Sequence, residues 1–199
     1  MRDLPTPRVA PRTAILRSAS QLFRRHGHRG TGVSEVFSAA SVPKGSLYYH
    51  FPGGKTEIVV AAVQRSGRAV NRAIEHAFHE TDLPGALTDI AEVLAANLEQ
   101  SGFLDGCPLA TVALEEAAAD DRIGDICRAV LDDWLARLNA ALRASGLTRS
   151  DAQDQAMLIL AAFEGALLVA RIHRDTTALH RVAILLAQQL PDIATSAQR

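Results

Sequence analysis

Apolar residues recur along this chain at helical spacing, and no segment alternates apolar and polar residues as a half-buried β-strand does. The first of these helical series runs from Ile15 to Phe23. A later segment, residues 156–170, is apolar on every side except at Glu164, so we expect it to be enclosed rather than solvated. The pattern predicts an all-α protein of nine helices without strands.

Residues at the ends of these series indicate where the helices start and stop. Gly27 is expected to cap the first helix, Thr31 to cap the second, and Pro43 to lie in the first turn of the third. Ser150 and Gln153 form a capping-box pattern before the eighth. The fourth, eighth and ninth helices are expected over about 55–80, 150–173 and 176–190.

The net charge of −1 conceals a strong asymmetry between the two parts of the chain. Residues 1–55 hold nine Lys/Arg and two acidic residues, a net charge of +7. Residues 56–199 hold 12 basic and 20 acidic residues, a net charge of −8. The contrast favours a polyanion, and first of all a nucleic acid, as the partner of the N-terminal part.

Composition argues against export, membrane spanning and a disulfide framework. Cys107 and Cys127 are the two cysteines, and the first twelve residues contain no apolar core of a signal peptide. The longest uncharged apolar run, 156–163, is shorter than the roughly 20 residues that a membrane span needs. We therefore expect a cytoplasmic protein with no membrane partner.

Short second and third helices beside a basic segment predict a helix-turn-helix motif over about 32–51. Its apolar anchors to the first helix are expected to be Val36, Phe37, Val42, Leu47 and Phe51. Residues 43–46 and 48–50 would face outward, and at least one of the adjacent Tyr48 and Tyr49 must be exposed because they lie about 100° apart around a helix. Thr31, Ser34 and the amides of 53–55 lie at helix starts, where phosphate can bind.

The segments Thr31-Gly32-Val33 and Ser41-Val42-Pro43-Lys44-Gly45-Ser46-Leu47-Tyr48-Tyr49-His50-Phe51 closely resemble the DNA-binding segment of TetR-family transcriptional repressors. The resemblance covers about residues 9–69. FPGGK at 51–55 and GCPLATVALE at 106–115 resemble the branch typified by the lincomycin-resistance repressor. Ser41 departs from the family pattern, since many members have Gly at this position in the turn.

The resemblance implies a nine-helix architecture in three parts: a flexible basic arm over 1–8, a three-helix DNA-binding domain over 9–69, and a ligand-binding and dimerisation domain over 70–199. It implies a homodimeric repressor that binds a palindromic double-stranded DNA operator and is released by a small-molecule inducer. By matched position, the DNA contacts would be Lys44, Gly45, Ser46, Tyr48, Tyr49 and His50, with Thr31 and Lys55 on phosphates.

The same resemblance implies a dimer interface formed by the last two long helices of each subunit, a four-helix bundle. The expected interface residues are Leu160, Glu164, Leu168, Leu179 and Leu186.

The ligand is expected to be small and hydrophobic or aromatic, with no cofactor. Its expected pocket residues are Phe78, Phe103, Cys107, Trp134, Met157 and Phe163. Asp105 and Glu164 are the polar groups expected to orient it.

Other functions remain alternatives on the same fold. A transcriptional activator has the same sequence features as a repressor. A redox sensor could use Cys107 and Cys127, and a metal-responsive regulator could use the cluster Glu75, His76, His79 and Glu80. An enzyme is not expected, because the chain has no nucleophile elbow, phosphate-binding glycine loop or convergent acid/base pair.

Overall fold

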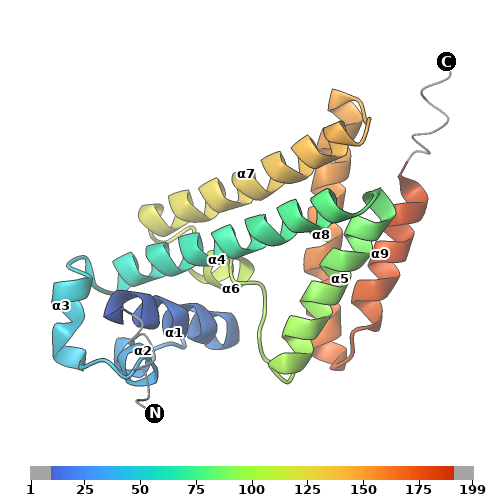
Figure 1. Ribbon diagram of the computed structural model, residues 1–199. Coiled ribbons are helices and arrows are strands. Elements are labelled where there is room, and N and C mark those ends of the chain that lie inside the picture. Colours follow the sequence, from blue (N-terminus) through green and yellow to red (C-terminus); the bar gives the residue numbers. More distant parts are fainter. Residues whose placement is uncertain (1–9, 191–199) are drawn as a thin grey trace, which may run out of the picture.

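One long helix, α4 (Gly54–Glu80), connects two groups of helices in the computed structural model, which describes residues 10–190 (Figure 1). Before it come α1 (Pro11–His26), α2 (Val33–Ala39), the 3₁₀ turn η1 (Lys44–Ser46) and α3 (Leu47–His50). After it come α5 (Leu83–Gln100), α6 (Ala110–Glu116), α7 (Asp121–Ala144), α8 (Arg149–His173) and α9 (Thr177–Gln189). The described residues contain nine α-helices and no strand, so the predicted all-α fold is confirmed. The expected arm over 1–8 lies outside them.

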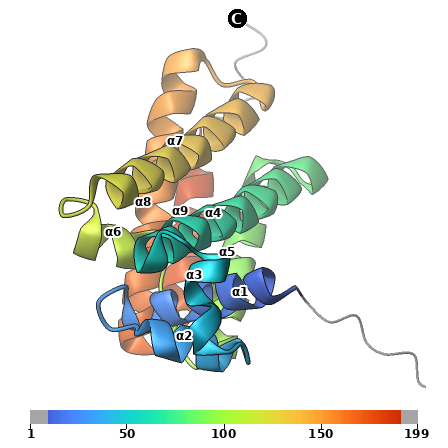
Figure 2. The same ribbon diagram turned by 90° about the vertical axis from the view of Figure 1, so that its left-hand side faces the viewer.

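Figures 1 and 2 show α1, α2 and α3 gathered around the start of α4, at one end of the molecule. Further along, α4 packs against α5 and α7, while α8 packs against α7 and α9, and α5 against α9. Gly67 permits the close approach of α4 to α7, because a Cβ there would lie 2.7 Å from Val130 Cγ1. Trp134 Nε1 donates to the Gly67 carbonyl at 3.2 Å and ties the same two helices together.

Apart from the start of the third helix, described below, helix ends agree with the predicted ends except at two caps. The eighth helix is capped by Thr148 rather than Ser150: Thr148 Oγ1 accepts from the Asp151 amide at 3.2 Å. The second helix has Gly32, not Thr31, at its N-cap, and Thr31 Oγ1 donates back to the Gly27 carbonyl at 2.7 Å. In both cases the observed N-cap lies one or two residues from the predicted one.

By length and composition alone, α8 could cross a membrane. The uncharged apolar run 156–163 within it is shorter than a membrane span, which is why the sequence predicted none. Its composition has another explanation in the fold. Six residues of α8 are buried against the rest of the chain, among them Ile159 and Phe163. Several of its other apolar residues, including Leu168, are exposed in the single chain. The helix therefore has a core face and a second apolar face that other surfaces can cover.

Candidate nucleic-acid interface and internal cavity

The helix-turn-helix is held to α1 by buried apolar side chains. Val36, Phe37 and Phe51 are almost fully buried, and Val42 and Leu47 are partly buried against the same core. The turn is closed by a hydrogen bond from the Val42 amide to the Phe37 carbonyl at 3.0 Å. Ser41 adopts φ 55°, so this serine occupies the left-handed conformation that glycine adopts without strain. The departure from the family pattern at Ser41 therefore leaves the turn geometry intact.

The tip of the motif projects two aromatic side chains into solvent. Tyr48 is 72% exposed and Tyr49 is 84% exposed, although large apolar rings are usually covered. The Tyr49 ring lies edge-on to His50, with centroids 4.9 Å apart. Lys44 and Gly45 are also exposed. The predicted outward orientation of the tyrosines is confirmed, and their contact with DNA stays a prediction.

The third helix begins differently from the prediction. Residues 44–46 form a 3₁₀ turn, and α-helical geometry starts only at Leu47. Pro43 therefore precedes the turn rather than occupying the first turn of an α-helix. Ser46 Oγ donates to the Pro43 carbonyl at 2.7 Å, which stabilises this tight start.

In the conformation described here, the side chains of two predicted phosphate contacts are engaged with other partners. Thr31 is 1% exposed, so its hydroxyl has no access to a phosphate. Lys55 is half-buried, and its Nζ donates to the His28 carbonyl at 2.8 Å. The Gly53 amide donates to Glu57 Oε2 at 2.9 Å, which occupies one of the amides expected to be open. Ser34 is exposed at the start of α2.

Acidic residues of α6 meet the segment that follows α1. Arg29 Nε donates to Glu116 Oε1 at 2.7 Å, and the Arg29 amide donates to Glu115 Oε2 at 2.8 Å. His28 Nδ1 lies 3.1 Å from the same Glu116 oxygen. The hydrogen bond from Arg29, and then that from His28, lowers the pKa of Glu116. These contacts join the DNA-binding end to the C-terminal helices, and no local sequence signal indicates them.

A second link uses the residues that we call the Asp105 cluster: Arg24, Arg25 and Asp105. Asp105 lies in the loop between α5 and α6, and both arginines are on the last turn of α1. Arg25 Nε donates to Asp105 Oδ1 at 2.8 Å, and Arg24 Nε lies 3.1 Å from Asp105 Oδ2. Beside them, the Gly106 amide donates to the Arg24 carbonyl at 3.1 Å. The cluster fixes the end of α1 to the loop.

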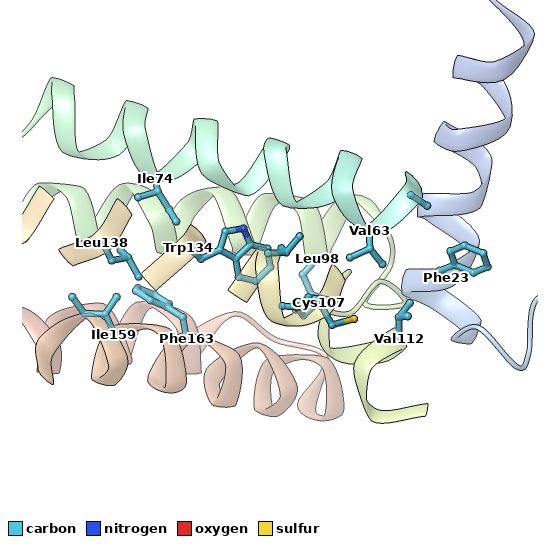
Figure 3. Close-up of a cluster of buried hydrophobic side chains, with 14 of the residues drawn as sticks. Phe23, Val63, Ile74, Leu98, Cys107, Val112, Trp134, Leu138, Ile159 and Phe163 are labelled. Atoms are coloured by element: carbon cyan, nitrogen blue, oxygen red, sulfur yellow. The ribbon is translucent and has the colours of Figure 1, made fainter. Parts of the chain in front are cut away.

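A cavity of about 630 Å³ lies directly beside the Asp105 cluster, enclosed by α1, α4, α5, α7 and α8. Its volume falls in the range of small-molecule sites, about 300–1,000 Å³. Figure 3 shows Trp134, Leu138 and Phe163 meeting in the space between the helices. Of the expected pocket residues, Cys107, Trp134 and Phe163 line the cavity, as do the polar candidates Asp105 and Glu164.

The other three expected pocket residues do not line this cavity. Met157 is 56% exposed on the outside of α8. Phe78 is partly buried against the core near the end of α4, and Phe103 lies in the loop after α5, with the Arg174 guanidinium 5.8 Å from its ring centroid. An aromatic residue on an amphipathic or apolar helix can lie in the core, on the surface or in the wall of a cavity. The spacing of apolar residues in the sequence does not distinguish these three positions.

The cavity contains a half-buried carboxyl group, that of Glu164, beside the thiol of Cys107. Burial raises the pKa of Glu164, and a hydrogen bond with Cys107 opposes this shift. Burial and the nearby Glu164 carboxyl raise the pKa of Cys107, and burial also raises that of Cys127. Because the thiolate is the reactive form of cysteine, these environments do not favour the redox-sensor alternative.

The metal cluster suggested by sequence does not converge. Glu75 pairs with Arg137, and His79 pairs with its neighbour Glu80 at 3.0 Å. Within residues 10–190, one trio of potential ligands lies close together: His28, Glu115 and Glu116, with ligand atoms within 4.8 Å of one another. Arg29 already provides a positive partner for this trio.

Exposed apolar side chains lie along the outside of α8 and α9, and we call this surface the outer face. Leu168 is 59% exposed there, and the small residues Ala161 and Gly165 lie along the same stripe. The other exposed apolar members are Met157, Leu158, Val169, Ile172, Ile184 and Leu185. A patch of this kind typically marks a protein–protein contact.

The expected dimer-interface residues divide between different environments. Leu168 belongs to the outer face. Leu179 and Leu186 are buried within their own chain, so they cannot reach a partner in this arrangement. Leu160 and Glu164 line the cavity instead. The predicted helices are appropriate for an interface, but four of the five chosen side chains are directed elsewhere.

Comparison with known proteins identifies both parts of the chain. Residues 15–62 match the family described as bacterial regulatory proteins, tetR family, and residues 85–184 match the LmrA/YxaF-like transcriptional regulator C-terminal domain. An uncharacterized HTH-type transcriptional regulator of Mycobacterium tuberculosis is 34% identical over 191 residues, which cover 92% of this chain and 97% of that protein. The HTH-type transcriptional regulator LmrA of Bacillus subtilis is 28% identical over 179 residues, covering 86% and 92%.

Solved structures share the fold at lower sequence identity. A regulatory protein TetR from Rhodobacter sphaeroides superposes with a TM-score of 0.78 at 24% identity, covering 88% of this chain and 96% of that one. A TetR transcriptional regulator from Legionella pneumophila gives a TM-score of 0.79 at 19% identity, covering 92% and 98%.

Proposed function

Because the chain belongs to the TetR family of DNA-binding transcriptional regulators, which are not enzymes, we propose that it is a homodimeric repressor released from its operator by a small molecule. It acts in the cytoplasm on a palindromic site in double-stranded DNA. It needs no metal or prosthetic group. The effector occupies the cavity beside the Asp105 cluster.

The observation that carries this proposal is the exposure of Tyr48 and Tyr49 at the tip of a rigidly anchored motif. A short helix that enters a major groove must project polar-tipped side chains beyond its supporting core. Tyrosine hydroxyls donate to phosphates or base edges, and the exposed Lys44 adds positive charge.

The outer face of α8 and α9 supports the homodimer. Ala161 and Gly165 have small side chains, so a second α8 can approach closely along this stripe. A two-fold dimer places two recognition segments (residues 44–50 of each subunit) on one side of a duplex, and these reach successive major grooves when they lie about 34–36 Å apart. This geometry matches a palindromic operator.

Release follows when the effector prefers a dimer with a different spacing of its recognition segments. By linkage, an effector with such a preference weakens DNA binding, typically by ~1–3 kcal/mol. Both α4, which runs from the cavity to the helix-turn-helix, and the Asp105 cluster connect the cavity with the DNA-binding end.

The test is selection of bound fragments from the source genome, followed by gel shift and a reporter assay. We expect a single enriched palindrome, a dimer-sized shifted complex, and higher reporter expression when the gene is deleted. Lower expression on deletion would identify an activator instead. The absence of any enriched sequence would contradict site-specific DNA binding.

A further inference from the structure

The Asp105 cluster contains more positive than negative charge. One carboxylate, Asp105, faces two guanidinium groups, those of Arg24 and Arg25. Arg25 forms a hydrogen bond to it, whereas Arg24 Nε is buried and forms none, despite lying 3.1 Å from Oδ2. A buried N–H donor that faces its ionic partner outside hydrogen-bond geometry is poorly satisfied, so this position favours a second anionic acceptor. All three residues line the cavity.

The rest of the cavity lining continues this excess of positive charge. Arg17 of α1 and Arg65 and Arg72 of α4 also line it, and within residues 10–190 none of the three forms an ion pair. Asp89 and Glu164 are the other acidic lining residues. Three of the five arginines that line the cavity come from α1 in the basic part of the chain, and Arg65 and Arg72 come from residues 56–199, whose net charge is −8. Charge of one sign in a cleft attracts ligands of the opposite sign.

The inner part of the cavity is apolar. Trp134, Leu138, Ile159 and Phe163 all contribute to its wall, and these side chains come from α7 and α8. They suit an aliphatic or aromatic body, whereas the arginines at the α1 end suit a carboxylate or a similar anion. The two parts of the lining therefore specify different parts of one molecule.

We propose that the effector is an amphipathic monoanion whose apolar body lies against Trp134 and Phe163 and whose anionic group binds Arg24 and Arg25 in competition with Asp105. This inference rests on the proposed function in taking the cavity as the effector site. It adds a ligand class and a route of transmission. An anion that binds Arg24 and Arg25 weakens their contacts with Asp105 in the α5–α6 loop. The end of α1, which supports the helix-turn-helix, is then held less firmly in place.

A matched pair of fluorescent probes tests the ligand class. 8-Anilino-1-naphthalenesulfonate and N-phenyl-1-naphthylamine share one ring system, and only the first carries a sulfonate. Trp134 is the single tryptophan and lines the cavity, so its quenching gives a second signal. We expect the sulfonate to bind the full-length protein at one molecule per chain and at least tenfold more tightly than the neutral amine. Equal affinity for the two probes would overturn the proposal.

Variants with opposite expected signs test the competition with Asp105. Arg25→Gln should lower sulfonate affinity about tenfold, whereas Asp105→Asn should raise it several-fold because it removes the competing carboxylate. Arg68→Gln, also on α4 but lining a separate hollow with Asn71 and Asp133 rather than the cavity, is the control and should leave affinity unchanged. If Arg25→Gln and Asp105→Asn shift affinity in the same direction, the cluster has only a structural role.

The DNA readout separates this inference from the proposed function. Sulfonate should weaken the gel shift of the wild-type protein, and this effect should be reduced in Arg25→Gln. If the sulfonate binds preferentially but does not release DNA, the anionic ligand class is supported and the proposed release of DNA by the effector is contradicted. Sequence-specific DNA binding with no preference between the probes would support the DNA-binding part of the proposed function and contradict the anionic ligand class.

Discussion

The recognition segment and the C-terminal helices differ in how far a residue's role is determined by its neighbours in sequence. Around α3, a helix of four residues, anchors at fixed spacing leave Tyr48 and Tyr49 outside, and both are exposed. Between residues 156 and 170 of α8, every position except Glu164 is apolar. There Phe163 is in the core and lines the cavity, while Leu168, one and a half turns away, is exposed. The sequence pattern predicts which way a side chain faces only where apolar and polar positions alternate around the helix.

The first prediction compares the effect on dimer formation of a charge placed on the outer face of α8 with that of a charge placed at an exposed apolar residue on another helix. Leu168→Arg places an unpaired charge on the outer face, so the dimer should dissociate. Losing the second recognition segment should reduce operator affinity by about 10²–10⁴-fold, the usual gain from bivalency. Analytical ultracentrifugation and gel shift measure both effects.

The matched control for this change is Leu114→Arg on α6. Leu114 is 88% exposed, more than Leu168, but it lies on a helix that is not part of the outer face. This variant should remain dimeric and bind the operator normally. A dimer that persists in Leu168→Arg would contradict the proposed interface.

The second prediction tests the recognition segment. Tyr49→Ala should remove about 1–3 kcal/mol of binding from each of the two copies, which is enough to abolish the gel shift at nanomolar protein. Since Tyr49 is 84% exposed, thermal stability and the dimer should be unchanged. Wild-type operator affinity in this variant would remove α3 from the interface.

Much of the fold and part of the site follow from sequence, and the limits have physical causes. Helix spacing and the Gly27 cap indicate the elements, because they depend on contacts within a turn or two. Thr31 and Lys55 resemble phosphate ligands in sequence, but their polar atoms bind the carbonyls of Gly27 and His28. The Arg29–Glu116 and Arg25–Asp105 contacts join residues more than 75 positions apart, so no local pattern contains them.

The third prediction sharpens this contrast with the chain's two lysines, Lys44 in η1 and Lys55 in α4. Exposed Lys44 is free to neutralise a phosphate, so Lys44→Gln should reduce the slope of log affinity against log salt by about 0.9 for each copy. Lys55→Gln should leave the slope unchanged and lower the melting temperature, because it removes the hydrogen bond to the His28 carbonyl. Equal slope changes in the two variants would show that Lys55 rearranges on DNA.

The fourth prediction has the smallest expected effect and tests whether Glu164 faces the cavity or a partner subunit. Burial raises its pKa, so the folded chain binds this proton more tightly than the unfolded chain. Stability therefore falls as pH rises from the ordinary carboxyl pKa of about 4.3 through the folded value, and is constant above it. Glu164→Gln cannot ionise, so its stability relative to wild type should increase across that window and then level off.

Thermal unfolding between pH 4.5 and 8 measures this difference, with the exposed Glu99→Gln as a control whose difference should stay flat. A carboxyl buried within one chain affects folding of that chain, so the gain should persist in a monomeric Ile184→Arg background, in which the new charge lies on α9 and not one turn from Glu164. A carboxyl buried by a partner would ionise freely in the monomer, and the gain would disappear there. Loss of the pH-dependent gain in the monomer would return Glu164 to the dimer interface that its helix first suggested.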